Sequence, residues 1–370
     1  MELKEYSISD IATLKYGKML AKTKFTENGY PVFSGYKITG YTSEYLYEEP
    51  EVIVVARGVG GTGDVKISPP KSWVTNLSIV LSVDTTIVDK FFFKEFLHAE
   101  NLKAKLDSGA SISQITIDSL KSYKFKLPDI SFQRSVRDVL INYDNLIENN
   151  NRRIAILEEM AQSLYREWFV NFRFPSHEDN LDADGTPKLV DSPLGQIPER
   201  WEVKRLDDFV TLQRGFDLPK KKRNEKGCVP IYAASGINGY HDQVKAKGPG
   251  IVTGRSGTLG IVNLVLEDHW PLNTSLWVKE FKGCTAFYAY YLLDSIGLER
   301  FNSGASVPTL NRNDVHGNPV IAPPKELIEK FENIVCVNHK QINVLKRKNE
   351  NLKKQRDMLL PKLISGDIEL

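Results

Sequence analysis

The chain has 370 residues, of which 41% are hydrophobic and 26% are charged, and its formal net charge at pH 7 is +2. This composition is typical of a globular protein with room for two ordinary domains. No stretch approaches the ~18 uninterrupted apolar residues of a membrane span, and the polar start does not resemble a signal peptide. The three cysteines lie far apart and indicate neither a disulfide framework nor a zinc site. We therefore expect a cytoplasmic protein without a metal site.

In chain order, residues 1–128 read as a compact α/β or α+β domain rich in loops. Strands are predicted at 52–58, 79–83 and 123–127, and helical spacing covers 91–106. The run Gly58 to Gly63 matches GxGxxG, but the sequence after it reads as a strand and a turn. A dinucleotide site needs a helix there. We therefore interpret this run as a glycine-rich hairpin.

A long helix is predicted next, within 129–170. Its apolar positions advance by four and three residues alternately, which is the pattern of a coiled-coil seam. At roughly 1.5 Å per residue such a helix is about 45–50 Å long. It could pack on its own globular half or pair with another helix. The predicted seam residues of this helix are Val136, Leu140, Tyr143, Ile147, Ile154, Leu157 and Leu164.

The second half repeats the first. A proline-containing linker is predicted at 171–200, followed by a second domain at 201–323 and a second long helix within 324–370. Strands are predicted at 250–257, 276–278 and 319–321, and helical spacing covers 285–301. The second seam lies 195 residues after the first, so that Val136 corresponds to Phe331; it consists of Phe331, Val335, Ile342, Leu345, Leu352 and Leu359.

Several loop residues are candidates for contacts with phosphates or bases. Arg57 and Arg255 each follow a strand beside glycine, where they could form an ion pair, clamp a phosphate or read a base edge. A Ser-Gly-Ala-Ser turn occurs at 108–111 and again at 303–306, and its hydroxyls and amides suit a phosphate. Basic loops add further candidates. The predicted contacts are Lys22, Lys24, Arg57, Ser111, Ser113 and Gln114 in the first half, and Lys220, Lys221, Arg255, Ser306 and Thr309 in the second.

The sequence contains no catalytic pattern that withstands inspection. It has no Asp/Asn-Pro-Pro-Tyr/Phe tetrapeptide of adenine methyltransferases, no GxxxxGK[ST] and no HExxH. Asp191, Glu202 and Lys204 loosely match the pattern of a metal-dependent nuclease. However, they lie on both sides of the end of the linker and occur in one half of the repeat only. We expect a binding protein without catalytic residues.

The whole chain resembles the specificity subunit of type I restriction–modification enzymes. The resemblance depends first on the two domain-plus-helix halves and on both Ser-Gly-Ala-Ser turns. It depends also on four segments: 149–154, 157–169, the Ser-Pro-Leu-Gly-Gln-Ile-Pro run at 192–198 with Trp-Glu-Val at 201–203, and the ending 359–368. No single motif is decisive, but their order and spacing together are specific.

The resemblance implies an α+β fold in which each half is a target recognition domain for one part of a split DNA site. It implies an antiparallel coiled coil that sets the gap between the half-sites. The implied partners are double-stranded DNA, two modification subunits that use S-adenosylmethionine, and optionally two restriction subunits that use ATP and Mg²⁺, with no cofactor in this chain and no membrane. Two alternatives stay open: a protein-interaction scaffold that does not recognise DNA, and an enzyme with unrecognised motifs.

Overall fold

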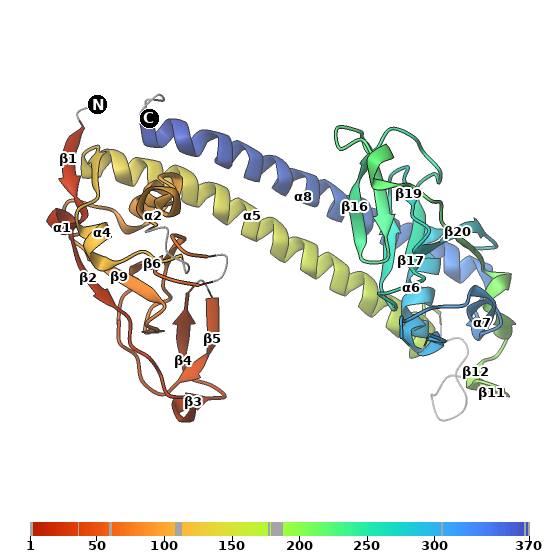
Figure 1. Cartoon of the computed structure of the whole chain (residues 1–370). Helices are drawn as coiled ribbons and strands as arrows, with labels where there is room; N and C mark the ends of the chain where they lie inside the picture. Colours follow the sequence, from red (N-terminus) through yellow and green to blue (C-terminus); the bar gives the residue numbers. More distant parts are fainter. Residues whose placement is uncertain are drawn as a thin grey trace. The chain divides into compact units, whose positions relative to one another are not determined.

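The computed structural model describes residues 3–35, 37–58, 61–107, 113–176, 178, 188–304, 306–365 and 368. The chain forms two compact units, 1–149 with 349–370 and 150–348. The two long helices are α5 (Ile130–Tyr165) and α8 (Lys325–Ser365), and α5 continues as a π-helical turn, η2 (Arg166–Val170). The boundary between the units cuts both helices. Each unit therefore consists of one globular domain and a stretch of each helix (Figure 1).

The first unit contains two four-stranded sheets and one strand pair. One sheet has the order β2 (Ala12–Tyr16), β9 (Ser78–Val83), β6 (Val52–Val55), β7 (Val65–Ile67), all antiparallel. The other has the order β3 (Phe25–Thr26), β5 (Lys37–Thr42), β4 (Tyr30–Ser34), β8 (Trp73–Val74), and β1 (Lys4–Ser7) pairs with β10 (Lys124–Leu127). The helices are α1 (Ile8–Ile11), η1 (Lys22–Lys24), α2 (Lys90–Ala99), α3 (Leu102–Leu106) and α4 (Ile117–Lys121).

The second unit repeats this topology. One sheet has the order β14 (Val210–Arg214), β20 (Ser275–Phe281), β17 (Gly250–Gly254), β18 (Val262–Val265). The other has the order β16 (Gly236–His241), β15 (Val229–Ala233), β19 (Trp270–Pro271), and β13 (Glu202–Arg205) pairs with β21 (Pro319–Ala322). The helices are η4 (Leu206–Asp208), η5 (Lys220–Lys222), α6 (Ala286–Ile296), η6 (Leu298–Phe301) and α7 (Arg312–His316). The predicted duplication of an α+β domain is confirmed: the main sheet and the strand pair recur, while the second sheet of this unit has, in the described part of the chain, three strands and lacks a counterpart of β3.

Three elements differ from the sequence prediction. The stretch 91–106 is two helices, because Asn101 adopts a left-handed conformation (φ 50°) and caps α3 through its side chain. Gly297 (φ 69°) likewise ends α6 before the short η6. The predicted linker 171–200 also contains a hairpin, β11 (Leu189–Ser192) with β12 (Gly195–Pro198).

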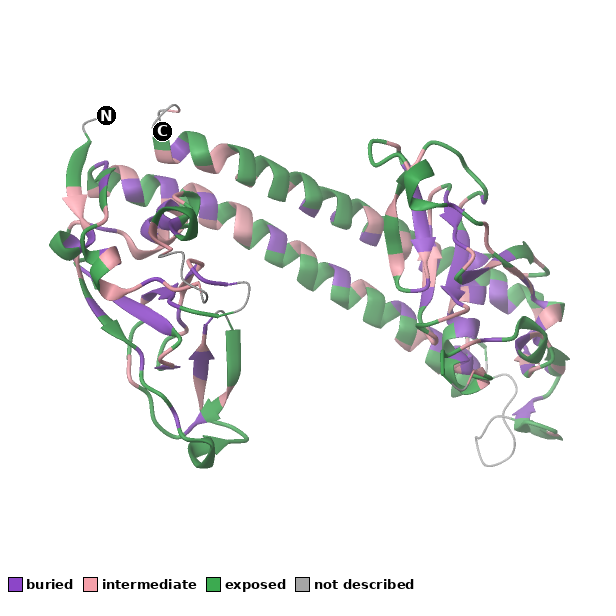
Figure 2. Cartoon of the chain, viewed as in Figure 1, coloured by how far each residue is buried: buried purple, intermediate pink, exposed green. Residues whose placement is uncertain are grey.

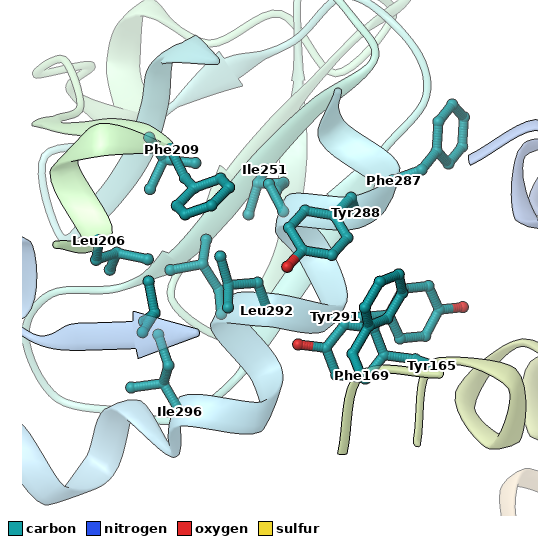
Figure 3. Close-up of a cluster of buried hydrophobic side chains, with 14 of the residues drawn as sticks. Tyr165, Phe169, Leu206, Phe209, Ile251, Phe287, Tyr288, Tyr291, Leu292 and Ile296 are labelled. Atoms are coloured by element: carbon teal, nitrogen blue, oxygen red, sulfur yellow. The ribbon is translucent and has the colours of Figure 1, made fainter. Parts of the chain in front are cut away.

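An aromatic cluster joins α5 to the second domain. The rings of Tyr165 and Phe169 lie 5.9 Å and 5.1 Å from that of Phe331 on α8. Phe169, in η2, is also 5.2 Å from Tyr288 on α6, and Figure 3 shows the rings of Tyr165 and Phe169 beside the tyrosines of that helix. Because Tyr288 is almost fully buried, this contact is part of the domain core rather than a surface contact.

The two long helices pair antiparallel in each unit. In the first, Asp144 of α5 bonds to Arg356 of α8 (2.6 Å), and Leu363 packs in the same cluster as Val136. In the second, Ile154 packs with Ile342 and Leu345. Buried positions recur along both helices (Figure 2). Among the predicted seam residues, the buried ones are Val136, Leu140, Ile147, Ile154, Phe331, Val335, Ile342 and Leu345, and the half-buried ones are Tyr143, Leu157, Leu164, Leu352 and Leu359.

Candidate nucleic-acid interface

In the first domain, the end of β6 meets the segment that precedes α4. Arg57 forms an isolated antiparallel bridge with Gln114, and the Ile115 N–H donates to the Ala56 carbonyl at 2.9 Å. The Ser113 hydroxyl donates to the Asp107 carboxylate at 2.5 Å. The fold therefore brings three predicted contact residues, Arg57, Ser113 and Gln114, to one place. Ser111 and the rest of the first Ser-Gly-Ala-Ser turn, residues 108–111, lie outside the described residues.

The second domain builds the same arrangement with different side chains. Ser256, next to Arg255, bridges Thr309, and the Leu310 N–H donates to the Arg255 carbonyl at 2.9 Å. The Thr309 hydroxyl donates to the Val307 carbonyl at 3.0 Å, which leaves its oxygen able to accept. Arg255 and Thr309 are thus neighbours, and Ser306 is exposed in the same loop.

Close backbone packing explains the glycine before Arg255. A β-carbon on Gly254 would lie 1.8 Å from the Thr258 carbonyl oxygen, so any other residue would push the strand end apart. Gly304 of the Ser-Gly-Ala-Ser turn is equally confined, with 1.9 Å to the Val307 carbonyl oxygen. The glycines of the motif therefore hold the loop that presents Ser306 and Thr309.

The predicted lysines lie on corresponding exposed 3₁₀ turns. Lys22 and Lys24 belong to η1, and Lys220 and Lys221 belong to η5, 198 positions later, although the two loops share little sequence. Lys24 forms an exposed ion pair with Glu44 (3.4 Å). Across the described residues, no hydrogen bond or ion pair joins these turns to the strand-end sites at Arg57 and Arg255. In each domain, the basic 3₁₀ turn and the strand-end arginine are therefore two separate candidate contacts.

Sequence reasoning missed two cations beside Arg255. Arg214 and Arg312 line the same shallow depression of about 400 Å³ as Arg255 and Thr309. The signal that could have found them is the strand register: Arg214 ends β14, which is the counterpart of β2, and Arg312 opens α7, which is the counterpart of α4. Neither position is basic in the first domain, so comparing the two halves of the sequence does not identify these arginines.

The described part of the chain shows no group of three or more His, Cys, Asp or Glu side chains arranged to hold a metal ion. None of its helices is both long enough and apolar enough to cross a membrane.

Comparison with known proteins identifies the family. The model of the type I restriction modification DNA specificity domain matches residues 1–159 and 198–354. The MjaIX specificity subunit of Methanocaldococcus jannaschii is 26% identical over 314 residues, covering 76% of this chain and 68% of that protein. The HindI specificity subunit of Haemophilus influenzae is 22% identical over 333 residues, covering 69% and 71%. In fold, the chain is similar to the crystal structure of a type I restriction–modification S subunit from M. genitalium (TM-score 0.71, 21% identity, 98% and 96% covered). The family model covers both halves of the repeat, and the chain belongs to the type I restriction–modification DNA specificity family.

Proposed function

We propose that this chain is a non-catalytic recognition subunit whose two domains, 1–128 and 201–323, each read one half of a bipartite DNA site. The observation that supports this most is the repeated strand-end arrangement: the same backbone bridge joins Arg57 to Gln114 in one domain and Ser256, next to Arg255, to Thr309 in the other. Arginine and amide side chains can contact base edges and phosphates alike. Since the two sets differ, the half-sites differ, and the target is asymmetric.

We propose that the helices within 129–170 and 324–370 act as the spacer between the half-sites. Support comes from the antiparallel pairing found in each unit, with the Asp144–Arg356 ion pair in one and the Ile154–Ile342 contact in the other. Dimeric DNA-binding proteins likewise read half-sites at a separation set by their own geometry. A helix pair resists bending because each seam side chain inserts between side chains of the partner helix.

We propose that two modification subunits that use S-adenosylmethionine dock on this helix pair, and that restriction subunits supply ATP- and Mg²⁺-dependent steps, all in the cytoplasm. Support comes from apolar side chains of the second unit that are about half exposed: Ile156 and Met160 on α5, and Ile334, Val337 and Val344 on α8. At 100° per residue both groups are rotated in the same sense from their seams. In an antiparallel pair this places them on one face, where a partner helix could cover them.

The test is to co-express the chain with its candidate modification subunit and map methylated adenines genome-wide. We expect a split, asymmetric motif that disappears when this chain is omitted. Exchanging residues 201–323 for those of another family member should change one half-site, and exchanging 1–128 should change the other. A change in both half-sites after a single exchange would contradict the modular reading, and a stable complex with no new methylation would contradict the recognition role.

The spacer is tested by inserting one heptad into each long helix, which preserves the seam. Seven residues add about 10 Å, or about three base pairs, to the non-specific gap of the methylated motif. The matched control inserts the heptad into one helix only, which puts the seams out of register. An unchanged gap in the double insertion would refute the spacer role.

A further inference from the structure

Two arginines lie at one end of the main sheet of the second domain. Arg214 is the last residue of β14 and stands opposite Leu276 of β20. Leu276 in turn stands opposite Thr253 of β17, two residues before Arg255. Arg214 ends β14 and Arg255 directly follows β17, and both strands pair with β20. The two arginines therefore lie at the same end of this sheet.

A third arginine is fixed at this edge by a short helix. Arg312 begins α7, and the Leu212 N–H of β14 donates to Nε2 of His316, at the other end of α7, at 2.8 Å. Burial lowers the pKa of His316, which favours the neutral ring that can accept this bond. Because Leu212 is two residues before Arg214, the bond holds α7 on the strand that carries Arg214.

Arg214, Arg255 and Arg312 all line one depression, and none of its lining residues is acidic. Its other lining residues are uncharged: Leu276, Thr309, Leu310 and Asn311. Within the described ranges, none of the three arginine side chains forms an ion pair or a side-chain hydrogen bond. Arg214 and Arg312 are exposed and Arg255 is half-buried. Three like charges without a carboxylate repel one another, and an anion bound between them would relieve that repulsion.

We propose that Arg214, Arg255 and Arg312 together bind one backbone phosphate of the DNA at the half-site of the second domain. This inference rests on the proposed function and adds the chemistry of one contact to it. Guanidinium groups suit a phosphate because they donate paired hydrogen bonds to its oxygens. A single arginine could read a base edge equally well, but three arginines that line one depression match an anion better than a base edge.

The first domain lacks this cluster. Tyr16 ends β2 opposite Ile79, as Arg214 ends β14 opposite Leu276. Ile117 follows the cap of α4, as Arg312 follows the cap of α7. Ala56 accepts the hydrogen bond from the Ile115 N–H as Arg255 accepts that from the Leu310 N–H, so the first domain has none of the three cations at these positions. The second domain consequently carries more of the sequence-independent, salt-dependent part of binding.

The experiment uses the full chain in complex with its modification subunit and a labelled duplex that contains the mapped site. Dissociation constants are measured by fluorescence anisotropy over a series of salt concentrations. The test variant is Arg214→Gln with Arg312→Gln. The matched control is Lys279→Gln, which removes an exposed charge from β20 away from the depression. A third variant, Arg214→Lys with Arg312→Lys, keeps both charges.

Losing one phosphate contact should lower the slope of log K against log salt by about 0.9. Binding in low salt should weaken about tenfold or more. The loss should be equal for duplexes with intact and with scrambled second half-sites, since a phosphate contact carries no sequence information. Lys279→Gln should bind as the parent complex does, and the lysine variant should keep most of the slope.

An unchanged slope in the glutamine variant overturns the phosphate site. A loss confined to one base-pair identity also overturns it and indicates base reading instead. Both results leave the proposed function intact, because the parent complex still binds its site. Failure of the parent complex to bind DNA at all overturns both proposals.

Discussion

His339 provides a pH-dependent test of how the second domain is attached to α8. Its ring lies among aromatic side chains of α6, and Nε2 and the Tyr291 hydroxyl share a hydrogen bond of 2.7 Å. Burial lowers the pKa of His339 to about 4 from an ordinary value of 6.5. The nearby Glu158 of α5 opposes this shift and Lys346 of α8 adds to it. The folded state therefore favours the neutral ring.

The sign and size of the pH effect follow from this depressed pKa. The unfolded chain takes up a proton near pH 6.5, whereas the folded chain does so only near pH 4. The stability that depends on the neutral ring is complete above pH 6.5 and is lost progressively as the pH falls towards 4. Between pH 7 and pH 5, linkage gives a loss of about 2 kcal/mol in the free energy of unfolding of this unit.

The assay is urea unfolding at pH 7 and pH 5, followed by tryptophan fluorescence, for the parent chain and His339→Gln. Glutamine does not titrate, so the fall in stability between the two pH values should be about 2 kcal/mol smaller in the variant. The matched control is His98→Gln, which replaces an exposed histidine of α2. An equal pH dependence in the parent and His339→Gln would refute the reasoning from burial.

Three other substitutions or modifications test the packing of the second unit. Ile154→Ala should lower the free energy of unfolding by about 2–5 kcal/mol in urea titration, because it empties a buried seam position; a loss below 1 kcal/mol would contradict the seam. Glu332→Ala should cost about 1–3 kcal/mol, since the buried carboxylate accepts from both the N–H and the hydroxyl of Thr285 at 2.6 Å, and Glu332→Gln should cost less. Iodoacetamide should label the exposed Cys228 well before Cys284, whose pKa burial raises to about 12, as peptide mass mapping can show.

The repeat also shows what sequence reasoning could not reach. Asp89 caps α2 and binds Arg137 of α5 at 2.8 Å, whereas Thr285 caps α6 and binds Glu332 of α8. The two pairs occupy corresponding places, offset by 195 or 196 residues, and both tie a domain helix to a long helix. Their chemistry is reversed, since the cap is the acid in one case and a hydroxyl in the other. Comparing residue types between the two halves of the sequence therefore detects neither pair.

The elements predicted correctly are those fixed by hydrophobic periodicity. Heptad spacing and short buried runs depend on side-chain burial alone, and they predicted the long helices and strands such as Val52–Val55. The errors arose where one backbone conformation decides the outcome. Asn101 in a left-handed conformation splits a helix, and a hairpin occupies part of the predicted linker. Spacing does not record such conformations, because many sequences can adopt them at small cost.

The scaffold and the recognition surface differ in the same way: burial constrains the residues of the scaffold but not those of the exposed surface. The order of the main sheet is shared by the two domains because their buried residues must fill similar cores. The exposed strand ends have no such constraint, so Arg214 can stand where the first domain has Tyr16 without disturbing a core. The strand-end arginines are not equivalent, because the hydrogen bonds to the Ala56 and Arg255 carbonyls place Arg255 where the first domain has Ala56. Arg57 instead corresponds to Ser256, and each of these two residues bridges the segment before the next short helix, at Gln114 and Thr309. The two domains therefore present an arginine from adjacent, different positions of the same strand end. It follows that exchanging a few strand-end side chains would alter one half-site while leaving the fold and the other half-site unchanged.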